Sequence, residues 1–222
     1  MSRRVALAAL LALGAATAVA APAAPSRERE AVFAHPADTA AIHAALGAVT
    51  HELAAAQSIA GLYTQNKFLH ELPQPLRAGG DFLFVRDLGV AWRTTTPFAS
   101  ELIVTRDALV QRDGGSTVRV AAEQQPAVRM VARIFFAVFS LDFSQLTELF
   151  TLSVLPAADG SWQLGLTPKQ DAGAIEAIVV GGHRSVERVR LYERGGDRTE
   201  IEFRDAQVST RPAGDALRAR FR

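Results

Sequence analysis

Between residues 79 and 97, two apolar runs lie on either side of a short turn. The runs are residues 82–85 and 90–92, and residues 86–89 connect them. This spacing predicts a β-hairpin, and Pro97 ends its second strand because proline has no backbone N–H to donate. Residues 82–85 are apolar on both faces of a strand, so both faces need a covering. We expect one face to meet the core and the other to meet a helix, a partner or an apolar ligand.

Upstream of the hairpin, residues 38–56 predict an amphipathic helix. Ile42, Leu46, Val49 and Leu53 recur at helical spacing, and Asp38 suits the N-cap position. His51 lies in this helix, but no second histidine follows four positions later, so the zinc-binding helix signature is absent.

Short strand-like segments follow each other closely in the rest of the chain. We place them at residues 59–69, 80–86, 90–96, 101–105, 108–112, 117–121, 151–155, 162–166, 175–180, 186–193 and 200–204. The first six are too close together to be joined by crossover helices, so the sheet must be antiparallel there.

Residues 126–150 interrupt the strands. Pro126 suits a first helical turn, and residues 128–139 are apolar nearly all round except for Arg129 and Arg133. A second short helix, residues 145–150, is expected to be capped by Ser144. The segment can be an ordinary core helix, or a helical cover over an open sheet with an apolar concave face.

The beginning of the chain has the pattern of an export signal. Arg3 and Arg4 precede an apolar run at residues 5–16, and small residues before Ala21 suit a cleavage site. We therefore expect a signal peptide at residues 1–20, a flexible segment at 21–35 and a single domain at 36–222. Loss of Arg3 and Arg4 changes the formal net charge from +1 to −1. A near-neutral chain lacks the basic surface that nucleic-acid binding requires.

Catalytic signatures are missing from the sequence. The chain has no Cys and no Gly-x-Ser-x-Gly motif, and its histidines lack metal-ligand spacing. We therefore expect no enzymatic activity, no cofactor and no metal site, although a lipid-directed enzyme would remain open if a titratable pair met inside a cavity. The chain has 12 Phe against 2 Tyr and 2 Trp, which indicates apolar binding or packing rather than catalysis.

One series of residues resembles a known family. Residues 62–65 read Leu-Tyr-Thr-Gln, and Gly80, Arg86, Trp92 and Pro97 follow in order. With similar pieces at residues 162–168, 175–181 and 189–203, this resembles the LolA-like periplasmic outer-membrane lipoprotein carriers over roughly residues 40 to 205. That family usually has Pro directly after the Arg, where this chain has Asp87, so the resemblance is to a divergent relative.

The resemblance implies an α+β fold. Its strongly curved antiparallel sheet forms an unclosed half-barrel, covered on the concave side by the helices at 38–56 and 126–150. It also implies a concave pocket for acyl chains and a lid held by the hairpin arginine. We expect a lipid-binding wall made of Phe82, Phe84, Trp92, Val131, Phe135 and Val138. Arg86 is expected to be the lid latch, and the alternative is a solvated turn residue paired with Asp87.

The function expected from this resemblance is transport of lipoprotein acyl chains or another lipid across the periplasm towards the outer membrane. An inner-membrane release complex and an outer-membrane acceptor would then be partners, and the carrier would be a monomer. The alternative is a periplasmic sensor or interaction module on the same fold, which detects lipidated or misfolded partners. The sequence does not identify the cargo.

Overall fold

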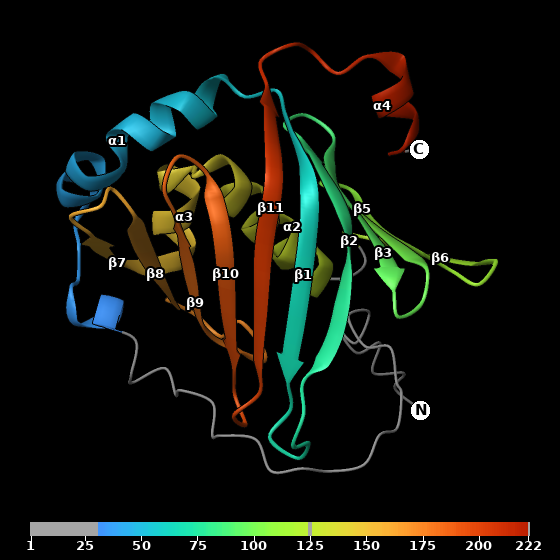
Figure 1. Cartoon of the computed structure of the whole chain (residues 1–222), viewed down its shortest axis with the longest axis horizontal. Helices are drawn as coiled ribbons and strands as arrows, with labels where there is room; N and C mark the ends of the chain where they lie inside the picture. Colours follow the sequence, from blue (N-terminus) through green and yellow to red (C-terminus); the bar gives the residue numbers. More distant parts are fainter. Residues whose placement is uncertain (1–30, 124–125, 222) are drawn as a thin grey trace.

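The computed structural model describes residues 31–123 and 126–221. The expected signal peptide at 1–20 and most of the segment at 21–35 lie outside the described residues. Figure 1 shows helices and strands that all belong to one body.

The helices are η2 (Ala31–Ala34, a 3-10 helix), α1 (Thr39–Ala55), α2 (Pro126–Ser140), α3 (Phe143–Leu149) and α4 (Asp215–Ala219). The strands are β1 (Ser58–Phe68), β2 (Leu76–Val85), β3 (Gly89–Thr96), β4 (Ser100–Thr105), β5 (Ala108–Asp113), β6 (Ser116–Ala121), β7 (Phe150–Pro156), β8 (Trp162–Pro168), β9 (Ile175–Gly182), β10 (Val186–Glu193) and β11 (Arg198–Ser209).

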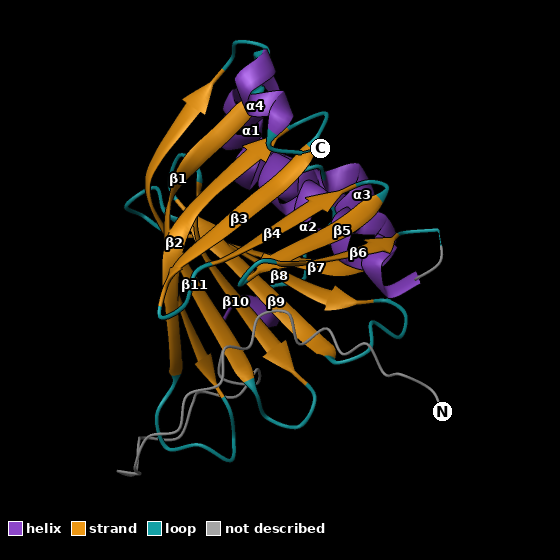
Figure 2. Ribbon diagram, turned by 90° about the vertical axis from the view of Figure 1, so that its right-hand side faces the viewer, coloured by secondary structure: helices purple, strands orange, loops and turns teal. Residues whose placement is uncertain are grey.

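The strands of the described residues form one sheet of eleven, in the order β6-β5-β4-β3-β2-β1-β11-β10-β9-β8-β7. Every neighbouring pair is antiparallel, and β1 joins the two halves by pairing with both β2 and β11. The two end strands, β6 and β7, do not pair with each other, so the barrel is not closed. Figure 2 shows the strongly curved sheet with α1, α2 and α3 on one side of it. The fold is therefore the expected α+β half-barrel with a helical cover.

The hairpin expected from residues 79–97 is confirmed as β2 and β3, with Phe84 opposite Val90 and Val85 opposite Gly89. Gly89 has φ +148, and a Cβ atom there would lie 2.1 Å from the carbonyl oxygen of Val104. Only glycine can therefore occupy the position where the turn enters β3.

Helix α1 begins where its capping residue predicts. The Asp38 side chain accepts a hydrogen bond of 2.8 Å from the backbone N–H of Ala41. Ile42, Leu46 and Leu53 are buried, and they place α1 on the same core as α2 and α3. Its stripe of apolar residues therefore decides which face the helix turns to the sheet.

Helix α3 differs from its prediction at both ends. It begins at Phe143 and ends at Leu149, so Phe150 is already the first residue of β7. Asp142 rather than Ser144 is the N-cap, because its carboxylate accepts from the backbone N–H groups of Ser144 and Gln145. The cap lies two positions before the expected hydroxyl, because one carboxylate oxygen, Oδ1, accepts from two of the free N–H groups of the first turn.

The segment expected to be flexible, residues 21–35, is structured from Ala31 onwards. Val32 is fully buried against the face of the sheet that points away from α2, in contact with Val179 and Tyr192. Beyond η2, His35 accepts a backbone hydrogen bond from Val154, and Ala37 donates one to Leu152. This correction has a physical reason, since the outer edge of β7 presents unpaired backbone groups that this segment satisfies.

The C-terminal residues cover the second apolar face of the β2–β3 hairpin. Phe82 and Phe84 point to the concave core, whereas Leu83 and Val85 belong to a separate cluster on the opposite face. That cluster is covered by residues from the end of the chain, namely Ala213, Leu217 and Phe221. The C-terminal residues of the protein thus cover the second apolar face of β2, which the sequence predicts to need a covering. None of the described helices is long and apolar enough to cross a bilayer.

Candidate ligand-binding site on the concave face

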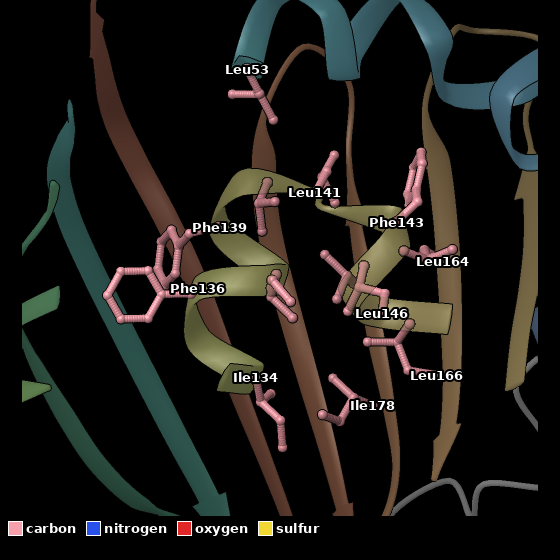
Figure 3. Close-up of a cluster of buried hydrophobic side chains, with 14 of the residues drawn as sticks. Leu53, Ile134, Phe136, Phe139, Leu141, Phe143, Leu146, Leu164, Leu166 and Ile178 are labelled. Atoms are coloured by element: carbon pink, nitrogen blue, oxygen red, sulfur yellow. The ribbon is translucent and has the colours of Figure 1, made fainter. Parts of the chain in front are cut away.

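Aromatic rings from three elements pack together between the sheet and α2. Phe84 of β2 stacks on Phe139 of α2 at 5.6 Å between ring centroids. Phe82 lies 4.8 Å from Phe203 of β11, and Phe139 lies 5.5 Å from the same ring. Figure 3 shows Phe136 and Phe139 projecting together from α2. The rings therefore join β2, β11 and α2 into one apolar cluster.

The residues expected to bind lipid belong to this cluster. Phe82, Phe84, Trp92 and Val138 are at most 5 % exposed, and Phe135 is partly buried against the same core. The side chain of Val131 lies outside the described residues. The rings contact one another, so in this structure they form a packed cluster rather than the wall of an open cavity. The reason is their size: large rings from facing elements fill the space between the sheet and α2.

A pocket of about 520 Å³ opens beside the cluster, on the concave side of β1 to β5. Trp92 is the one expected lipid-binding residue that lines it. Its walls are Tyr63, Gln65, Leu76, Arg77, Ala78, Trp92, Thr94, Pro97, Phe98, Ala99, Ser100, Glu101, Leu102, Gln111, Asp113 and Gly114. The volume lies within the range typical of small-molecule sites, and apolar and polar groups share the lining.

Sequence reasoning did not identify this pocket, because it depends on the register of five consecutive strands, β1 to β5, and not on a pattern within one of them. Trp92, Leu102 and Gln111 lie in one row across β3, β4 and β5 through their strand pairing. A usable signal was nevertheless present on β1. Tyr63 and Gln65 are two residues apart and so share a face of the strand. A glutamine on the apolar face of a strand is the kind of buried polar residue that marks a site.

The polar part of the pocket is centred on Tyr63. Its hydroxyl shares a hydrogen bond of 2.7 Å with Thr94 Oγ1 across the small residue Gly80. Burial raises the pKa of Tyr63, and the neighbouring polar hydrogens of Thr94 and Trp92 only partly oppose this. Tyr63 is therefore neutral throughout the physiological range and acts as a hydrogen-bonding wall.

Arg86 ties the turn of the hairpin to the end of α1. Its Nε donates to the carbonyl oxygen of Ala56 at 2.7 Å, and its Nη2 donates to that of Leu53 at 2.6 Å. These carbonyls belong to the last turn and the C-cap of α1, and the carbonyl oxygen of Leu53 also accepts a hydrogen bond from the backbone N–H of Ala56 at 3.1 Å. A cation is also favoured at this end of a helix dipole. The two hydrogen bonds thus go to α1 and not to Asp87.

The charged groups of the described residues do not form a cluster of metal ligands. No group of three or more potential metal ligands occurs among them. Glu101, at the edge of the pocket, is held by Arg112 at 2.8 Å and faces Arg220 at 3.5 Å. The pKa of Asp197 is lowered, because hydrogen bonds from His70 outweigh the effect of burial, but this residue lies outside the pocket.

Solved structures with a similar fold are only distantly related. A LolA superfamily protein from Nitrosomonas europaea is 9 % identical, with a TM-score of 0.42 over 77 % of this chain and 96 % of the other. LprF from Mycobacterium bovis is 15 % identical, with a TM-score of 0.40 over 81 % of this chain and 100 % of the other. MucB in the Pseudomonas aeruginosa MucA/MucB complex is 16 % identical, with a TM-score of 0.34 over 78 % of this chain and 59 % of the other. These scores are too low to support inferences about this chain.

Family membership is shown at the level of sequence. Comparison with curated proteins gives no match. The profile of the family described as "Outer membrane lipoprotein carrier protein LolA" matches residues 54–218, which include the hairpin, α2 and the whole pocket. The chain therefore belongs to the LolA family of outer membrane lipoprotein carrier proteins.

Proposed function

We propose that this protein binds the acyl chains of a lipoprotein, or another lipid, in the periplasm and carries them towards the outer membrane. The observation that carries the proposal is the content of the concave face. It holds a cluster of eight aromatic rings, made of Tyr63, Phe82, Phe84, Trp92, Phe135, Phe136, Phe139 and Phe203, which opens at Trp92 into the pocket of about 520 Å³. Such a surface favours apolar chains because it removes them from water.

The cluster residues would contact the cargo once α2 moves away from the sheet. Phe82, Phe84 and Trp92 would supply the wall on the hairpin, and Val131, Phe135 and Val138 the wall on the helix. Phe135 supports this role because it lies at the boundary of the cluster, 6.3 Å from Trp92, and is partly exposed. An acyl chain that enters from the pocket would meet the contact between Phe135 and Trp92 first.

Arg86 would act as the latch of the helical cover. Its hydrogen bonds to Leu53 and Ala56 hold α1, and α1 in turn shares its apolar core with α2. Opening the concave face would therefore require these bonds to break. An Arg86→Leu variant that loads cargo but fails to pass it on would support the latch, whereas unchanged loading and release would contradict it.

The proposed function is tested by identifying what the protein binds. The full-length protein is expressed in a Gram-negative host, purified from the periplasm and extracted for lipid mass spectrometry, with a periplasmic protein of similar size as control. Enrichment of acylated peptides or other lipids is expected. Absence of any enriched lipid, together with failure to bind an apolar fluorescent probe, would overturn the proposal.

A second candidate is an interaction module, favoured by the exposed end strand of the sheet. In β6 the first four residues are exposed, and Val118 is 54 % exposed. An uncovered end strand can pair with a strand of another protein. Capture of one defined partner by the wild-type protein but not by Val118→Arg, without lipid enrichment, would favour this second function.

A further inference from the structure

The two end strands of the sheet differ in how the described residues cover them. The edge of β7 is taken by the segment that follows η2, which forms backbone hydrogen bonds with Leu152 and Val154. At the other end, β5 is the only strand of the described residues that pairs with β6. In Figure 1 the β5–β6 hairpin forms this end of the sheet. The described part of the chain thus leaves the β6 edge of the half-barrel open to a further strand.

The backbone of β6 has groups directed towards that open side. The hydrogen bond from the N–H of Ala122 to the carbonyl oxygen of Asp107 sets the alternation of the β5–β6 ladder. By this alternation Thr117, Arg119 and Ala121 belong to the pairs that are not hydrogen-bonded to each other. Their N–H and C=O groups therefore point away from β5, and Thr117 and Arg119 are exposed.

The β6 edge also continues the floor of the concave pocket. One row of directly paired residues crosses β3, β4, β5 and β6, and it consists of Trp92, Leu102, Gln111 and Val118. Residues paired in this way have their side chains on the same face of the sheet. The first three line the pocket, and Val118 follows them with 54 % of its surface exposed. A molecule that leaves the pocket along this row passes over β6.

We propose that the β6 edge binds the polypeptide part of an acylated cargo as an added strand. This inference rests on the proposed function, because the apolar cluster would hold the acyl chain and leave the attached peptide outside. The peptide would begin where the acyl chain leaves the pocket, beside Gln111 and Val118. Strand addition uses main-chain hydrogen bonds, so the edge accepts peptides of different sequence.

The test compares ligands that share one dodecanoyl chain. The first ligand carries a serine- and threonine-rich peptide of six residues, the length of β6, with the chain on its N-terminus. The second carries the same peptide methylated on every peptide nitrogen, which removes its N–H donors and prevents strand pairing. The third is N-methyldodecanamide, and the fourth is the peptide without the acyl chain.

Each ligand is titrated into the full-length protein below its aggregation concentration, and binding is measured by calorimetry. The first ligand should bind about tenfold more tightly than the second and the third, as one or two additional backbone hydrogen bonds predict. The amides of Thr117 and Arg119 should also exchange hydrogen more slowly with the first ligand than with the second.

Variants then assign this advantage to β6. Arg119→Pro should abolish it, because proline removes an outward N–H while the ladder with β5 stays intact. Arg119→Ala is the matched control, since it removes the charge and keeps the N–H, and it should retain the advantage. Thr117→Pro with Thr117→Ala repeats the comparison if Arg119→Pro does not fold.

The outcomes separate this inference from the proposed function. Equal binding of the three acylated ligands would overturn strand addition and leave lipid carriage intact, and so would an advantage that survives both proline variants. Binding of the peptide alone as tightly as the first ligand would also overturn the inference, because the edge would then act without the acyl chain. Failure of all three acylated ligands to bind would overturn both proposals.

Discussion

The Nη2 atom of Arg86 donates a hydrogen bond of 2.6 Å to the carbonyl oxygen of Leu53, so a hairpin turn holds the last turn of a helix 33 residues earlier in the chain. We expect Arg86→Leu to lower the free energy of unfolding by about 1.5–3 kcal/mol, the usual contribution of a hydrogen bond from a charged group. The amides near the end of α1 should also exchange hydrogen faster, which hydrogen-exchange mass spectrometry measures.

The matched control is Arg184, which also contacts α1. It pairs with Glu52 at 3.1 Å, but its side chain is 84 % exposed. Exposed ion pairs contribute little, so Arg184→Leu should leave both stability and exchange almost unchanged. Equal effects of the two substitutions would show that Arg86 does not hold α1.

Phe139 and Phe135 should respond differently to truncation. Phe139 is 5 % exposed and contacts the rings of Phe82, Phe84 and Phe203. Phe139→Ala should therefore lower the free energy of unfolding by about 3–5 kcal/mol, as large-to-small changes in cores do. Denaturant titration measures this loss.

Phe135→Asn tests the role proposed for the boundary of the cluster. It should weaken binding of an apolar fluorescent probe roughly tenfold, because an unpaired amide would face the chain. The thermal midpoint should fall only slightly, since Phe135 is partly exposed. A collapse of the midpoint to the level of Phe139→Ala would identify α2 as a plain core helix.

The N-cap of α3 should make stability depend on acidity. Burial opposes ionisation of Asp142, but hydrogen bonds from Ser144 and Gln145 outweigh it, so its pKa is lowered from 3.8. A lowered pKa stabilises the fold above the pKa of the unfolded chain, and this stabilisation disappears as the pH falls through the folded-state value. Asp142→Asn should retain most of the cap at pH 7 and lose this acid dependence.

Asp142→Ala separates the cap from the charge. It should cost about 1 kcal/mol at pH 7, because it removes the acceptor altogether. Thermal unfolding between pH 7 and pH 2.5 measures all three proteins. A constant difference between wild type and Asp142→Asn across that range would contradict the lowered pKa.

The C-terminal residues should be required for stability, although they follow the last strand. Leu217 packs on the outer cluster formed by Leu83, Val85 and their neighbours. Leu217→Asp should lower the free energy of unfolding by about 1–3 kcal/mol, because it places a charge against apolar side chains. Ala216→Asp is the control at an exposed position of the same helix and should have little effect. Similar losses for both would mean that the tail is not a cover.

The fold was largely predictable because local patterns agree with the global structure. The hairpin, the antiparallel order and the stripe of α1 follow from hydrophobic spacing alone, as Phe84 opposite Val90 and the buried Ile42 illustrate. Sequence reasoning failed where a contact between distant segments decides the structure. Val32 and Leu217 carry no periodic signal, because each packs on a sheet face whose need for covering arises elsewhere in the chain.

The candidate site was predictable only in part, because contacts between different strands and helices decide its shape. The apolar residues of the hairpin and α2 could be assigned to one region, but their packing against each other depends on the distance between sheet and helix. The pocket itself requires the register that brings Gln111 beside Leu102 and Trp92, and no local pattern encodes that alignment. Arg86 was identified through a resemblance, and its partners Leu53 and Ala56 became visible only in the structure.

The ring cluster also governs how tightly a chain could be held under the proposed function. An acyl chain that lies along Phe84 and Phe139 must replace the 5.6 Å contact between the two rings. Its binding free energy is therefore the gain from burying the acyl chain minus the loss of the contact between the rings. Affinity then falls below what the lining area alone would predict. Under the proposed function, the protein's own rings would compete with the acyl chain for the same wall, and they would promote release by packing together again as the acyl chain leaves.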